Sequence, residues 1–166
     1  MKLCLVLFIS ILGIGLSEKF YHIGRWMTGN WYQGNAYCNS INQRLISIMS
    51  EQENEKVTKF IKNSGYPLSE NSFWTSGTKL GENFIYWMSN GSKIVYKNFV
   101  DKKPYNLTVT EAQAEKCVEL RGLNDLKWNE VRCDIDLRFV CEIESASRLS
   151  IWDTIHNRDN VVKEEN

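Results

Sequence analysis

The cysteines constrain this chain more than any other feature of its sequence. There are five in 166 residues, and Cys4 lies in an apolar N-terminal run. The other four are Cys38, Cys117, Cys133 and Cys141. Zinc sites usually contain cysteine pairs separated by roughly two to four residues, and every gap here is longer. An even number of cysteines in an exported chain therefore predicts two disulfides, for which three pairings are open.

The N-terminal segment predicts export from the cell. Lys2 is followed by an apolar run that reaches Leu16, and Gly15 and Ser17 are small residues at the two positions that a signal peptidase recognises. We expect residues 1–17 to be a signal peptide, cleaved after Ser17. A membrane anchor is the alternative, but the run is shorter than the ~20 residues needed to cross a bilayer. The mature chain is expected to be secreted and extracellular, without a membrane span.

The composition fits one domain with a sizeable core. Removing 17 residues from 166 leaves 149, within the usual range of roughly 100–200 residues for one domain. Loss of Lys2 leaves 19 basic residues against 20 acidic ones, a balance that does not favour binding to nucleic acid or to an anionic membrane. Six Trp, seven Tyr and seven Phe residues are available to fill the core.

Two helices are expected in the first half of the mature chain. The first begins after Thr28 or Asn30, either of which can cap it. The second follows a capping box at Ser50–Glu53, with serine at the cap and glutamate three residues later. Asn63–Gly65 is a typical helix end.

Short strands with alternating apolar residues dominate the rest of the chain. The candidates are Phe20–Trp26, Leu45–Ile48, Phe73–Thr75, Phe84–Trp87, Cys117–Leu120, Lys127–Asn129 and Arg138–Cys141. Helices followed by a run of short strands predict an α+β domain, which we place at residues 18–143. Residues 144–166 form a polar tail, for which a short docking helix and a frayed end are both open.

One long segment, from Phe99 to Glu115, has neither helical nor strand periodicity. It is polar and contains Pro104. Loops of this length are uncommon in compact domains and are usually functional. This segment is therefore the candidate binding loop.

Several motifs occur in the order found in the C-type lectin-like domain. They are Trp31 with Ala36 and Cys38, Leu45 with Ser47-Ile48 and Glu53, Phe73-Trp74-Thr75-Ser76-Gly77, Tyr86-Trp87 with Asn90-Gly91, Cys117-Val118-Glu119-Leu120, Lys127-Trp128-Asn129-Glu130, Cys133, and Phe139-Val140-Cys141-Glu142. The chain resembles this family over nearly the whole mature sequence. The resemblance implies two helices and two small antiparallel sheets with a long irregular loop. It also implies the disulfides Cys38–Cys141 and Cys117–Cys133.

The resemblance implies a site at the long loop, where lectins of this family typically hold a calcium ion that binds sugar hydroxyls. Calcium requires several oxygen ligands, many of them carboxylates. Glu115 and Asn129 match two ligand positions, and Glu130 stands where aspartate is usual. These three residues are the predicted metal ligands. Together with Tyr105, which could stack on a sugar or anchor a protein partner, they are the predicted ligand-binding set.

The loop also departs from the family pattern. Lys103-Pro104-Tyr105 stands where Glu-Pro-Asn or Gln-Pro-Asp is typical, so the proline is retained and both oxygen ligands are lost. Two sequons predict glycosylation at Asn90 and Asn106. A glycan on Asn106 would crowd the calcium site.

No set of residues predicts catalysis. The two histidines, His22 and His156, fall in an expected strand and in the tail. Asp134 and Asp136 are close in sequence but follow Cys133 in an expected surface turn, and a glycosidase needs its two carboxylates to flank a cleft. The chain is therefore not expected to be an enzyme.

Two functions remain open. The first is a secreted carbohydrate-binding protein, possibly dependent on Ca2+, whose partners are glycans or glycoproteins. The second is a calcium-independent module of the same fold that binds a protein partner. The triplet Lys103–Tyr105 favours the second, whereas Glu115 and the pair Asn129-Glu130 favour the first. The frequency of sugar binding in the family makes the first the preferred prediction.

Overall fold

The first helix begins at the second of its two expected caps. The structure is a computed structural model that describes residues 18–24, 27–79, 84–100 and 116–144. Helix α1 (Trp31–Ser40) is capped by Asn30, whose side chain accepts a hydrogen bond from Gln33 N while Gln33 Oε1 accepts one from Asn30 N. The two side chains thus satisfy two amides that a helix start leaves unpaired.

Helix α2 (Glu51–Lys62) is capped by Ser50, as predicted. Ser50 Oγ accepts from Glu53 N at 3.2 Å, but the Glu53 carboxylate accepts from Met49 N, one residue before the cap. The capping box is therefore only half formed. The helix ends at Asn63, and Gly65 follows with φ +84°, a left-handed conformation that glycine adopts without strain.

Replacing Ser50 with alanine should lower the free energy of unfolding by about 1 kcal/mol, because the Glu53 amide loses its acceptor. Urea denaturation monitored by circular dichroism measures this change. Ser69→Ala is a matched control at an exposed serine, where the change should stay within about 0.5 kcal/mol. Equal effects of the two substitutions would contradict the assigned cap.

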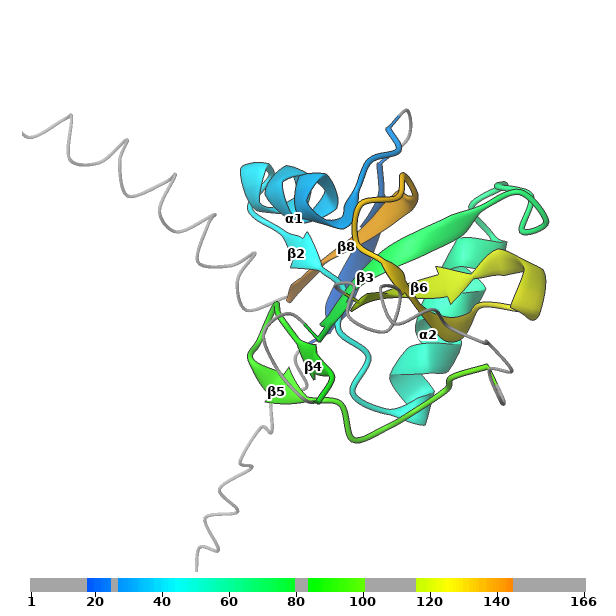
Figure 1. Cartoon of the computed structure of the whole chain (residues 1–166). Helices are drawn as coiled ribbons and strands as arrows, with labels where there is room; N and C mark the ends of the chain where they lie inside the picture. The colour runs from blue at the N-terminus through cyan, green and yellow to red at the C-terminus, as the bar shows by residue number, and fades with distance from the viewer. Residues whose placement is uncertain (1–17, 25–26, 80–83, 101–115, 145–166) are drawn as a thin grey trace, which may run out of the picture. The chain divides into compact units, whose positions relative to one another are not determined.

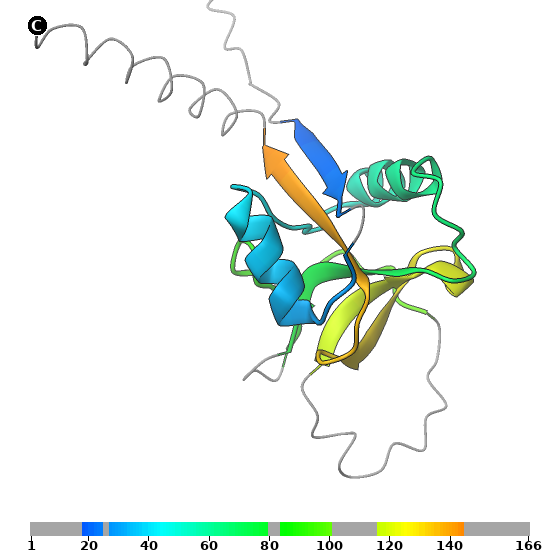
Figure 2. The same cartoon turned by 90° about the horizontal axis from the view of Figure 1, so that it is seen from above.

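The strands form one connected, mixed arrangement (Figure 1). They are β1 (Lys19–Ile23), β2 (Arg44–Leu45), β3 (Ser72–Thr78), β4 (Tyr86–Trp87), β5 (Ser92–Lys93), β6 (Lys116–Arg121), β7 (Lys127–Arg132) and β8 (Arg138–Glu144), with a 3-10 turn at Gly122–Asn124. The order is β1-β8-β3-β4-β5. In addition, β2 pairs with β8, β6 pairs with β3, and β7 pairs with β6. Figure 2 shows β1 and β8 side by side and running in opposite directions.

The predicted α+β class is confirmed, and one detail of the sheets differs. Strands β3 and β8 pair in parallel, Phe73 with Arg138 and Trp74 with Phe139. This pair joins the strands into one connected mixed sheet, where two small antiparallel sheets were expected. A parallel pair needs a long connection between its strands, and the stretch from β3 to β8 is long enough to provide it.

Two apolar clusters make up the core, and four tryptophans are central to them. Trp31 and Trp74 lie in the cluster that contains the four cysteines, and Trp87 packs edge-on against Trp128 in the other. Each is at most 2% exposed, as expected for core residues. Their polar edges are satisfied: the Trp31 indole donates to a backbone carbonyl at 2.8 Å and that of Trp74 to another at 2.9 Å.

Two disulfides connect distant parts of the chain. Cys38 of α1 is bonded to Cys141 of β8, and Cys117 of β6 is bonded to Cys133, which follows β7. This is the pairing that the family resemblance implies. Close packing accompanies the first bridge, since a Cβ at Gly34 of α1 would lie 3.0 Å from the Phe139 ring of β8.

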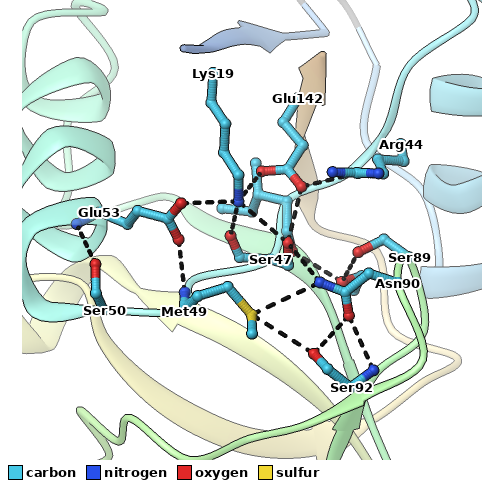
Figure 3. Close-up of polar contacts among 12 residues, drawn as sticks. Lys19, Arg44, Ser47, Met49, Ser50, Glu53, Ser89, Asn90, Ser92 and Glu142 are labelled. Atoms are coloured by element: carbon cyan, nitrogen blue, oxygen red, sulfur yellow. Dashed lines mark hydrogen bonds and ion pairs between the residues drawn. The ribbon is translucent and has the colours of Figure 1, made fainter. Parts of the chain in front are cut away.

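A buried carboxylate lies on β8 directly after Cys141, among residues from three other segments (Figure 3). Glu142 is fully buried and accepts hydrogen bonds from Arg44 Nε (3.0 Å) and Ser47 Oγ (2.8 Å). Its second oxygen lies 3.2 Å from Lys19 Nζ, an ion pair without hydrogen-bond geometry. Lys19 also contacts Glu53 at 3.1 Å. The cluster thereby ties β1, α2 and the β2 segment to β8.

Candidate functional site

The residues on either side of the long polar segment 101–115, Val100 and Lys116, both lie next to β7. On one edge of β7, Val100 N donates a hydrogen bond to Trp128 O at 2.9 Å. On the other edge, β7 pairs with β6, whose first residue, Lys116, lies opposite Arg132. The described residues that flank the segment therefore lie at the two edges of the same strand. Residues 101–115 themselves, with the predicted Tyr105, Asn106 and Glu115, lie outside the described residues.

Asn129 lies on β7, directly opposite Glu119 of β6. Its Nδ2 donates to Glu119 Oε1 at 2.8 Å, and both residues are only 5% exposed. A buried carboxylate is costly unless a donor compensates it, and the amide supplies that donor. Asn129 thus has a structural partner within the sheet.

Glu130, the next residue, points to the opposite face of β7 because side chains alternate along a strand. Its Oε2 lies 3.1 Å from Nζ of Lys79, the residue that follows β3. The two side chains are 20% and 36% exposed, so the pair is within reach of solvent. Lys79 is fixed at its backbone as well, since its N–H donates to Lys116 O at 2.9 Å.

The described part of the site does not fit a calcium ion. The side chains of Asn129 and Glu130 point to opposite faces of β7, and the carboxylate of Glu130 is already paired with the ammonium group of Lys79. Within the described residues there is no group of three or more His, Cys, Asp or Glu side chains that could hold a metal. At ~4 Å and an effective dielectric of about 20, calcium would be repelled by a lysine by roughly 8 kcal/mol. Glu115 lies outside the described residues, so the complete predicted ligand set stays a prediction.

Sequence reasoning missed Lys79 and Glu119, the partners of the two predicted ligands. Glu119 had one signal: it is an acidic residue inside the apolar strand Cys117–Leu120, where a polar partner is needed. Lys79 had none, because its contact with Glu130 spans 51 residues of sequence.

Asn90, the first predicted glycosylation site, is exposed in the turn between β4 and β5. Its Oδ1 accepts hydrogen bonds from Ser92 N (3.0 Å) and Ser92 Oγ (2.6 Å) (Figure 3). Its Nδ2 lies 3.4 Å from Ser47 Oγ. Asn106 lies outside the described residues, and glycosylation at both positions stays a prediction.

Two of the residues weighed for catalysis have other partners. His22 Nε2 lies 3.2 Å from the Tyr37 hydroxyl, and Asp134 forms a hydrogen-bonded ion pair with Arg132. The hydrogen bond from the Arg132 side chain holds the pKa of Asp134 below its usual value. An acid of lowered pKa is ionised at neutral pH and is a poor proton donor.

Comparison with known proteins identifies the class. The family described as Lectin C-type domain matches residues 28–143, and the chain belongs to this family. A C-type lectin of Culex quinquefasciatus, mosGCTL-7, is 30% identical over 119 residues, which is 68% of each chain. The human low affinity immunoglobulin epsilon Fc receptor is 28% identical over 130 residues, covering 78% of this chain and 36% of the receptor.

Solved structures agree on the fold. Human lithostathine has a TM-score of 0.65 at 24% identity, covering 78% of this chain and 88% of that one. A second structure is the C-type carbohydrate-recognition domain of cow CD23, crystallised in the presence of a GlcNAc2Man3 oligosaccharide. It has a TM-score of 0.59 at 25% identity, and the match covers 75% of this chain and 87% of that one. Within the described residues, no helix is both long and apolar enough to cross a membrane.

Proposed function

We propose that the mature chain is a secreted protein that binds carbohydrate at a surface formed by β7 and the segment 101–115. The observation that carries the proposal is that the residues flanking that segment, Val100 and Lys116, lie at the two edges of the strand that contains Glu130. The proposal includes removal of a signal peptide at residues 1–17, a binding domain at 18–143 and a polar tail at 144–166. Two disulfides support an oxidising, extracellular setting.

The side chains at this surface suit sugar hydroxyls. A saccharide hydroxyl can both donate and accept a hydrogen bond. Lys79 offers donors to it, and the Glu130 carboxylate offers acceptors. Tyr105 would supply an aromatic face for the apolar side of a sugar ring. Glu115 and Asn129 complete the proposed ligand set. This chemistry amounts to binding without catalysis.

Relatives support the sugar hypothesis. The mosquito relative is named a lectin, and the cow CD23 domain was crystallised with an oligosaccharide. Anchoring both ends of a binding segment also reduces the entropy that the protein loses when it binds a ligand.

A glycan array probed with the purified mature protein tests the proposal. We expect binding to a subset of glycans, and we expect Tyr105→Ala to weaken it at least about tenfold, the loss of roughly 1.4 kcal/mol. The melting temperature should not change. Tyr32→Ala, at a tyrosine of α1 that is 43% exposed, is a matched control that should bind like the wild type. The proposal would be contradicted if the well-folded protein bound no glycan on the array.

A protein partner is the second candidate, and one observation favours it. Phe84, Met88 and Val95, around the β4–β5 hairpin, are 41%, 41% and 84% exposed. Large apolar side chains that are exposed around one hairpin could provide a contact surface for a protein. Val95→Asp should abolish capture of such a partner and leave glycan binding unchanged.

A further inference from the structure

The ion pair between Lys79 and Glu130 lies on a rigid part of the molecule. Lys79 follows β3 and Glu130 is on β7, so the pair spans the intervening strand β6. Backbone hydrogen bonds hold both residues: Lys79 N donates to Lys116 O, and Glu130 is in register with Val118. The disulfide Cys117–Cys133 ties β6 to the end of β7. The sheet therefore fixes the backbone positions of the two residues that carry these charges.

The surroundings of this pair are rich in cations. Lys79 is hydrogen-bonded to Lys116 through the backbone, and Lys116 lies opposite Arg132. These three residues form one row across three neighbouring chain segments. Arg132 is itself paired with Asp134, so Lys79 and Lys116 are the members of this row whose charges would repel a divalent cation near a carboxylate. Glu130 is that carboxylate.

We propose that Lys79 serves as a built-in cation for Glu130, so that this face binds a polyhydroxylated ligand without a metal ion. The ammonium group neutralises and orients the carboxylate, a role that would otherwise fall to calcium. An ammonium has three donors, and a carboxylate can accept several hydrogen bonds. Placed side by side, they match the two hydroxyl groups of a vicinal diol in a saccharide. The choice of ligand rests on the proposed function, whereas the independence from metal does not.

Calcium titration of the purified mature protein tests the metal-independent part. We expect neither heat in calorimetry nor a change in melting temperature up to millimolar calcium. A thermal shift with calcium that disappears in Glu130→Gln would overturn the proposal. This outcome is readable even if the protein binds no sugar.

Substitution of Lys79 tests the ion pair itself. Lys79→Met should lower the melting temperature by about 2 °C, because the ion pair between Lys79 and Glu130 is lost. Adding Glu130→Gln to that variant should recover part of the loss, whereas purely additive effects would contradict a functional pair. Lys59→Met, at an exposed lysine of α2, is the matched control.

Ligand binding provides the third readout. With a chelator present, the wild type should bind its best glycan with unchanged affinity. Lys79→Met should bind the same glycan at least about tenfold more weakly, and Lys79→Arg should show a smaller loss of affinity. Loss of wild-type binding in the chelator would overturn the inference while leaving the proposed sugar binding intact. Absence of glycan binding in every condition would overturn the proposed function and the saccharide assignment, whereas the calcium and stability results would still decide the role of Lys79.

Discussion

Replacing Cys38 and Cys141 together with alanine should lower the free energy of unfolding by about 4–5 kcal/mol. The bridge joins residues 103 apart, so it removes a large part of the conformational freedom of the unfolded chain. Both sulfurs are fully buried, and their removal also takes contacts from the cluster around Trp31 and Trp74. Urea denaturation of the purified variant measures the change.

The second disulfide is the matched control for the first. Cys117 and Cys133 are only 16 residues apart, so their double replacement should cost about 3 kcal/mol on the same chain-entropy argument. A larger loss for the short loop than for the long one would contradict this explanation. Mass mapping of the oxidised protein verifies the pairing directly.

Glu142→Ala should lower the free energy of unfolding by about 3–5 kcal/mol. The side chain is completely buried, and its removal takes one of two carboxylates from Lys19, the ion pair from Arg44 and the acceptor from Ser47 Oγ. Buried charges that lose their partner are strongly destabilising. Thermal and urea unfolding both report this loss.

Glu53→Ala is a useful comparison for Glu142. Its side chain is 23% exposed and pairs with the same Lys19, so solvent screens the interaction and its loss should cost no more than about 1 kcal/mol. If Glu142→Ala were no worse than Glu53→Ala, the buried cluster would not be a main stabilising feature.

Local features of the fold could be predicted from the sequence because they depend on neighbouring residues. Ser50 caps α2 through an amide three residues away, and Asn30 caps α1 in the same way. The core tryptophans follow from their size and their places in apolar stretches. The α+β class follows from the order of these local patterns.

The charged contacts of the candidate site could not be predicted, because they depend on the register of distant strands. Strands β3 and β6 change register between Trp74 and Thr78, and this irregularity determines which residue of β6 lies beside Lys79. Gly77 lies within this irregular stretch, and a glycine inside a strand can mark a bulge, but it does not say which residue of β6 comes to lie opposite. The short strand β5 was missed for a related reason: its two residues pair only with β4 and have no alternating apolar pattern of their own.

The pairing of β1 with β8 determines how this domain can be joined to other sequences. Lys19 is at the start of β1 and Glu142 is near the end of β8, and Lys19 Nζ lies 3.2 Å from Glu142 Oε2. The first and last strands of the domain therefore begin and end side by side. A module with neighbouring ends can be inserted into a surface loop of a host protein, or repeated in tandem, without stretching either partner.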